Sequence, residues 1–289
     1  MNWLVYHIAS GQAFFTGVAL LLLAALAAMS ARPRFRRLTG LAFVVGVIAV
    51  VASSTAIPYW LYAIACVVTL FWIASGFRKS WRRGAALAFV AVWASAVCLE
   101  APYHVSPSLA RADSRRLTIL GDSVTAGVGG GETSETWPSI VAREHQLQVQ
   151  DLSHVGETAG SALKRARAQS IDSPVLVIEI GGNDILGTTT VSQFANDLES
   201  LLAYVAAPDR QIIMFELPLP PFYHEYGRVQ RALASKYGVH LVPKRVFLSV
   251  LAGDDSTLDT IHLSQAGHRA MADCVWRLVG PAFVDVGME

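Results

Sequence analysis

Residues 1–31 contain no Asp, Glu, Lys or Arg, and this charge-free stretch restricts the fold of the chain more than any other feature. Over the whole chain of 289 residues only 16% are charged, whereas a soluble domain has about 25%. From Arg111 onward the composition is that of an ordinary globular protein. We therefore predict three parts: a membrane region at residues 1–103, a linker at 104–116 and a soluble domain at 117–289, which is long enough to bury its own core.

The membrane region contains four apolar segments, each near the ~20 residues that a helix needs to cross a bilayer: Gly11–Ser30, Leu38–Ile57, Tyr59–Phe77 and Gly84–Pro102. Basic residues follow the first segment and precede the last: Arg32, Arg34, Arg36, Arg37, Arg78, Lys79, Arg82 and Arg83. The positive-inside rule places both basic loops in the cytoplasm and the soluble domain outside. No Lys or Arg precedes the first segment, so it does not resemble a cleaved signal peptide.

These features predict a multi-pass protein of a bacterial inner membrane, with the lipid membrane as its partner and the soluble domain in the periplasm. The net charge of +1 offers no general attraction for nucleic acid. The three cysteines, Cys66, Cys98 and Cys274, show no metal-type spacing, and the soluble domain contains only one of them. We expect no metal, no cofactor and no disulfide within that domain.

In the soluble domain, short apolar runs alternate with helical patterns. The expected strands are residues 116–121, 147–152, 174–181, 211–217 and 238–243. The expected helices are residues 134–145, 157–169, 190–206, 223–237 and 264–280. This alternation predicts an α/β fold with a parallel sheet and helices on both faces. Sites in such sheets form at the carboxyl ends of the strands.

The stretch TILGDSVTAGVGGG, residues 118–131, follows the first of these runs. It cannot be a nucleotide-triphosphate loop, because no lysine occurs between Thr118 and Lys164. The dinucleotide motif fails at Glu132 and the elbow G-x-S-x-G fails at Thr125, where each pattern needs a glycine. The stretch is then either an ordinary turn or a strand-to-helix turn that presents Ser123 as a nucleophile.

Later stretches favour the nucleophile. Gly156 follows the second strand, GGND with Asn183 follows the third, and DTIH with Asp259 and His262 precedes the last helix. With RLTILGDSVTAG, WPSIVA, VIEIGGNDIL and DTIHLSQAGHRAMA, the chain resembles the SGNH (GDSL-type) hydrolase family. It is most similar to the periplasmic thioesterase, lysophospholipase and arylesterase branch. The resemblance spans residues 117–280 and implies a flavodoxin-like sheet.

The resemblance also implies roles for five residues. Ser123 is the expected nucleophile, and His262 is the base that takes its proton. Asp259, three residues before His262, can hold the imidazole from the same loop. The expected oxyanion hole consists of the Ser123 backbone N–H, Gly156 and the Asn183 amide.

The predicted function is therefore that of a membrane-anchored, extracytoplasmic serine esterase. It would cleave acyl esters or thioesters, such as lysophospholipids, through an acyl-serine intermediate. One alternative is an O-acetyl esterase or acyltransferase acting on an acylated envelope glycan. A second alternative is a non-catalytic, membrane-anchored binding module.

Overall fold

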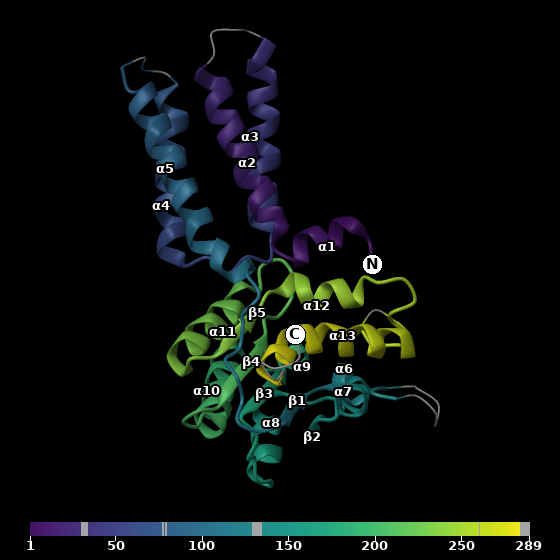
Figure 1. Cartoon of the computed structure of the whole chain (residues 1–289). Helices are drawn as coiled ribbons and strands as arrows, with labels where there is room; N and C mark the ends of the chain where they lie inside the picture. The colour runs from purple at the N-terminus through teal and green to yellow at the C-terminus, as the bar shows by residue number, and fades with distance from the viewer. Residues whose placement is uncertain (30–33, 77, 79, 129–134, 260, 284–289) are drawn as a thin grey trace. The chain divides into compact units, whose positions relative to one another are not determined.

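The computed structural model describes residues 1–29, 34–76, 78, 80–128, 135–259 and 261–283, without the side chains of 34–37. The chain forms two compact units (Figure 1). We call Asn2–His104 with Pro218–Arg228 the helical unit, and Val105–Leu217 with Val229–Glu289 the sheet unit. Of the basic residues behind the predicted orientation, Arg32 and Lys79 lie outside the described residues.

The sheet unit is built on five parallel strands in the order β2-β1-β3-β4-β5. They are β1 (Arg116–Gly121), β2 (Gln148–Asp151), β3 (Val175–Glu179), β4 (Gln211–Phe215) and β5 (His240–Val242). Each lies at a position predicted from the sequence, and most are shorter than predicted. The order 2-1-3-4-5 is that of a flavodoxin-like sheet, so the predicted fold class is confirmed.

Helices cover both faces of this sheet. Those that join the strands are α7 (Trp137–His145), α8 (Ala159–Arg167), α10 (Val191–Val205) and α11 (His224–Tyr237), and α13 (Gln265–Phe283) follows the last strand. The connection through α7 leads from β1 to β2, at one edge of the sheet. The connections through α8, α10 and α11 lead the other way, toward β5 at the opposite edge. Because such crossovers are right-handed, α7 and the other three cover opposite faces. The packing agrees, since α13 packs against α7 and α8 packs against α10.

Three short helices of the sheet unit were not predicted: α6 (Ser123–Ala126), α9 (Gly182–Leu186) and α12 (Lys244–Leu251). They are too short to show a helical repeat in the sequence. Both α6 and α9 begin directly after a strand, where the predicted site residues lie.

The strand register brings the carboxyl ends of the central strands together. Gly121, the last residue of β1, is paired with Glu179, the last residue of β3. Every residue of β3 is buried, which explains its almost continuous apolar sequence. Segments that follow β1 and β3 therefore begin side by side.

The expected linker has no regular structure between residue 105 and β1, but it is bonded to the sheet unit. The backbone N–H of Ala110 donates to the side chain of Gln211, whose amide donates to the Ala110 carbonyl (2.6 and 2.8 Å). The N–H of Ala112 donates to the carbonyl of Ala282 (2.9 Å). These bonds hold the linker along the sheet unit.

A buried charge cluster follows β4. The Glu216 carboxylate lies 2.7 Å from Arg231 Nε and 3.7 Å from Lys244 Nζ, and all three side chains are buried. Glu216→Ala removes the carboxylate that both cations share. We expect the free energy of unfolding to fall by about 3–5 kcal/mol, because breaking a buried ion pair leaves charge in a poorly solvated place.

Thermal unfolding of the purified chain tests this prediction. The matched control is Glu199→Ala, because Glu199 forms an exposed ion pair with Lys236 and such pairs contribute little. The control is expected to unfold close to the wild-type temperature. Equal shifts in the two variants would contradict a stabilising role for the buried cluster.

The helical unit contains α1 (Trp3–Ala9), α2 (Gln12–Met29), α3 (Arg34–Ala52), α4 (Tyr59–Ser75) and α5 (Arg82–Glu100), with a 3₁₀ turn at Ala101–His104. The helix pairs α2/α3 and α4/α5 pack as hairpins (Figure 1). The backbones of α2 and α3 approach closely at two glycines. A side chain on Gly17 would lie 2.7 Å from the Gly46 carbonyl, and one on Gly46 would lie 2.9 Å from the Gly17 carbonyl.

Two helical stretches of the described residues are long and apolar enough to cross a membrane: Gln12–Met29 and Arg82–His104. The apolar stretches Leu38–Ala52 and Tyr59–Ser75 are shorter. The second predicted segment ends at Ala52 rather than Ile57, because the N–H of Ser54 donates to the carbonyl of Ile8 (3.0 Å) instead of continuing the helix. Pro58 is the N-cap of the next helix. Two of the four predicted segments thus meet the length requirement.

The segment Pro218–Arg228, which follows β4 and includes the first turn of α11, folds with the helical unit. The Leu219 N–H donates to the Ser54 hydroxyl (2.9 Å), and the His224 ring donates to the Ser53 carbonyl (2.7 Å). A strand–helix connection ordinarily remains within its own α/β domain. The sequence did not predict that this one joins the helical unit.

Candidate functional site

Ser123 is the first residue of α6, directly after β1, and its side chain is buried. Asp122 caps this helix, since its Oδ1 accepts a hydrogen bond from the Val124 N–H (2.9 Å). The turn is tight, because a side chain on Gly121 would lie 2.3 Å from the Thr125 hydroxyl. Position 121 therefore requires glycine, which explains the first residue of the GDS motif.

The segment after β2 runs beside the end of β1. The N–H of His154 donates to the carbonyl of Gly121 (3.0 Å). Gly156 has φ +76°, a conformation that favours glycine, and a side chain there would meet no atom within 4 Å. The buried Glu157 carboxylate accepts from Arg165 Nε (2.6 Å), and this ion pair holds the segment against α8.

Asn183, on α9, links the three strand-end segments. Its amide nitrogen donates to Asp122 Oδ2 and to the Glu157 carbonyl, each at 3.1 Å. The amide has two hydrogens, and these two bonds use both. The residues around Ser123, Gly156 and Asn183 are thus joined by hydrogen bonds, as their positions after neighbouring strands predict.

Asp259 and His262 form a separate pair in the loop before α13. Asp259 Oδ2 lies 2.6 Å from His262 Nδ1, and Oδ1 accepts from the N–H groups of Ile261 and His262 (2.8 and 2.9 Å). The backbone bond from His262, with the ring bond, holds the pKa of Asp259 well below its usual range. Asp259 therefore remains ionised and can orient the imidazole.

The charge of His262 acts on Asp122, the residue before Ser123. Burial raises the pKa of Asp122, whereas the bond from Val124 and the charge of His262 lower it. Among the described residues, no hydrogen bond joins the Ser123 hydroxyl to His262. Catalytic hydrogen bonds are often long in enzymes without substrate and shorten when substrate binds.

Two members of this site were not predicted from the sequence. Glu179, at the end of β3, is buried and accepts from the Thr125 hydroxyl (2.9 Å) and, at 3.5 Å, from the Asp122 N–H. Thr125, on α6, supplies the hydroxyl of this bond. A single carboxyl within the apolar run VLVIEI was the available signal for Glu179, because a buried acid requires a specific partner.

The part of the chain that the structure describes contains no group of three or more His, Cys, Asp or Glu side chains arranged to hold a metal ion. The acid–base groups described above are organised by hydrogen bonds among themselves.

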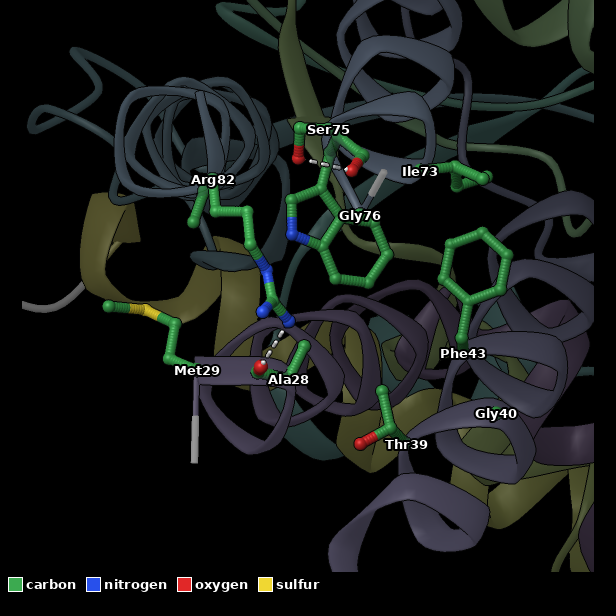
Figure 2. Close-up of a pocket in the computed structure, with 11 residues that line it drawn as sticks. Ala28, Met29, Thr39, Gly40, Phe43, Ile73, Ser75, Gly76 and Arg82 are labelled. Carbon is green, nitrogen blue, oxygen red and sulfur yellow. Dashed lines mark hydrogen bonds between the residues drawn. The ribbon is translucent and has the colours of Figure 1, made fainter. Parts of the chain in front are cut away.

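A cavity of about 280 Å³ lies elsewhere, in the helical unit. Figure 2 shows its lining, with Phe43 on one side and Arg82 reaching the carbonyl of Ala28, to which it donates (3.1 Å). The lining is largely apolar and includes Trp72. None of the predicted site residues lines this cavity, so it is separate from the groups around Ser123.

Comparison with known families gives one match over much of the sheet unit. Residues 119–270 match the GDSL-like Lipase/Acylhydrolase family. This range includes all five residues predicted for the site, from Ser123 to His262.

Individual relatives agree with this match. The chain is 28% identical to Esterase TesA of Pseudomonas aeruginosa over 185 residues, 59% of this chain and 90% of that protein. It is 27% identical to the thioesterase 1/protease 1/lysophospholipase L1 of Escherichia coli over 177 residues, 57% of this chain and 83% of that protein. Both alignments leave a large part of this chain unmatched.

Solved structures share the fold. The crystal structure of TesA covers 58% of this chain and 99% of its own, with 26% identity and a TM-score of 0.50. The esterase EstA from Pseudoalteromonas covers 58% of this chain and 97% of its own, with 22% identity and a TM-score of 0.51. At that identity the second likeness concerns the fold alone.

Proposed function

The chain belongs to the GDSL-like lipase/acylhydrolase family, and from this we propose that it hydrolyses acyl esters or thioesters through a covalent acyl intermediate on Ser123. The chain is an esterase-type hydrolase of this family, with esterase and thioesterase relatives. The roles of individual residues, the substrate and the membrane location are our proposals.

The observation that supports the mechanism most directly is the 2.6 Å hydrogen bond between Asp259 and His262. A carboxylate that binds Nδ1 selects the tautomer in which Nε2 is free to accept a proton. It also stabilises the imidazolium that forms when the proton is transferred. A histidine base held by a carboxylate in this way can remove the proton of a serine hydroxyl and so activate it.

In the proposed reaction, His262 Nε2 takes the hydroxyl proton of Ser123 as the oxygen attacks the acyl carbon. The tetrahedral intermediate collapses when the bond to the leaving alcohol or thiol breaks, and His262 returns the proton to that leaving group. A water molecule then attacks the acyl-serine and gives its proton to His262. The acid is released, and the proton returns to Ser123.

The proposed oxyanion donors are the N–H groups of Ser123 and Gly156 and the Asn183 amide. Each donor of this kind contributes about 3 kcal/mol to the transition state. Since both amide hydrogens of Asn183 are already bonded, an oxyanion must displace the Glu157 carbonyl or share a hydrogen with it. Asp122 can remain bonded throughout and orient the amide.

We further propose that the helical unit anchors the enzyme in a membrane, with the sheet unit outside the cytoplasm. Two helices of sufficient length support this, and so do the exposed leucine, isoleucine and valine side chains along the helices. Arg78 lies between α4 and α5, and Arg82 and Arg83 begin α5. Basic residues in the loops between membrane helices are typical of the cytoplasmic side. A lysophospholipid or a similar acyl ester would be available at such a membrane.

The function is tested with p-nitrophenyl acyl esters, acyl thioesters and lysophospholipid, together with a fluorophosphonate probe. We expect hydrolysis and covalent labelling that maps to Ser123. Transfer of the acyl group to a glycan acceptor in product analysis would instead support the acyltransferase alternative. Folded protein that neither hydrolyses these substrates nor reacts with the probe would support the binding module.

The location is tested by fusing reporters after Glu289. Alkaline phosphatase, which is active outside the cytoplasm, is expected to be active in this fusion. Activity of a cytoplasmic reporter alone would contradict the proposed orientation without affecting the esterase assignment.

A further inference from the structure

A small network of buried polar side chains lies between the ends of β1 and β3. Glu179 Oε2 accepts from the Thr125 hydroxyl at 2.9 Å and from the Asp122 N–H at 3.5 Å, so the Glu179 and Asp122 carboxyls lie close enough for each to affect the pKa of the other. Asp122 in turn accepts from the Val124 N–H and the Asn183 amide (2.9 and 3.1 Å). The carboxyl groups of Asp122 and Glu179 thus lie close together, next to the turn that carries Ser123.

Two adjacent buried carboxyls cannot both be ionised without a large cost, so one of them holds a proton. None of the ion pairs among the described residues involves either acid. Asp122 accepts two N–H bonds and is near the charge of His262, which favours its ionised form. Glu179 has only the Thr125 hydroxyl and one long backbone bond.

The proton therefore belongs on Glu179. Burial first, and then the charge of Asp122, raise the pKa of Glu179 well above its usual range. The other titratable groups that act on the pair do so through Asp122: Glu157 raises the pKa of that carboxyl and His262 lowers it.

We propose that Glu179 is a positioning residue for the hydrolase site, a neutral carboxylic acid that donates its proton to Asp122 and so fixes the carboxylate that orients Asn183 and the Ser123 turn. The inference rests on the proposed function only for its kinetic consequence. Glu179 touches none of the reacting groups and acts through Asp122. Without its donor, Asp122 would take up the proton itself or turn away, and the Asn183 amide would lose its acceptor.

The substitution Glu179→Gln tests this. Glutamine has the same shape, its amide N–H can donate to Asp122, and its carbonyl can accept from Thr125. We expect Glu179→Gln to retain most of the wild-type kcat/KM, whereas Glu179→Ala loses about 10²-fold through misplacement of the oxyanion donor. As the pH rises through the pKa of Glu179, the wild type should lose activity as the acid ionises, and the Gln variant should not.

Infrared spectroscopy supplies a measurement that needs no activity. The wild-type spectrum should contain the carbonyl band of a buried, protonated carboxylic acid, and the Gln variant should lack it. The proposal is overturned if folded Glu179→Gln loses as much activity as Glu179→Ala, or if the band is unchanged. If Glu179→Ala fails to fold, the activities and infrared spectra of the wild type and Glu179→Gln still test the proposal. A protein without esterase activity would still give the infrared result.

Discussion

Ser123→Ala is expected to lower kcat for ester hydrolysis by about 10⁴- to 10⁶-fold and to abolish labelling by a fluorophosphonate. The reason is chemical, because the variant has no oxygen at position 123 that can form the acyl intermediate. The fold should be preserved, since within the described part of the sheet unit no hydrogen bond involves the Ser123 hydroxyl. Stopped assays with p-nitrophenyl esters measure the effect over this range.

The matched control is Ser249→Ala, which removes a hydroxyl from the exposed side of α12, where Ser249 donates to the carbonyl of Val246. It should retain wild-type activity and labelling. An active Ser123→Ala enzyme would show that another residue is the nucleophile, and the remaining roles would then need to be reassigned.

His262→Ala is expected to cause a loss of the same order, about 10⁴- to 10⁶-fold in kcat, because serine is a weak nucleophile without a base. Asp259→Asn should cost about 10⁴-fold, since an amide cannot stabilise the imidazolium and favours the wrong tautomer. The double variant Ser123→Ala/His262→Ala should lose no more of kcat than either single variant, because the two residues act as a unit. Additive losses would contradict a shared mechanism.

The pH dependence follows from the same pair. The pKa of Asp259 is lowered, so its carboxylate persists as the solution is acidified and is lost only at a pH below the usual range for aspartate. Protonation of Asp259 should therefore not limit kcat/KM in mildly acidic solution, and Asp259→Asn should lower kcat/KM across the profile. His7→Ala, in the helical unit, is the matched control and should leave the whole profile unchanged.

The sequence alone was sufficient for the architecture of the sheet unit. Strands and helices that alternate along the chain leave recognisable apolar patterns. The clearest example is β3, which is buried along its whole length and has an almost continuous apolar sequence. The helices α6 and α9 were missed because each is about one turn long. Their existence depends on caps such as Asp122, which act only once the strand ends are in place.

The helical unit was predicted less completely. Mean hydropathy identified the apolar segments, but it could not show that α3 ends at Ala52 or that Pro218–Arg228 joins this unit. The second feature depends on bonds such as the one from Leu219 to Ser54, between residues far apart in the sequence. No local pattern encodes such a partner.

The sequence by itself determined the family, the fold class and the candidate residues Ser123, Asp259 and His262, because motifs at the ends of strands retain their order along the chain. Only the tertiary structure showed which acidic groups lie beside Ser123. Asp122 and Glu179 are separated in the sequence and become neighbours through the β1–β3 register. A carboxyl holds or releases its proton according to its neighbours and its burial, and both are properties of the folded chain.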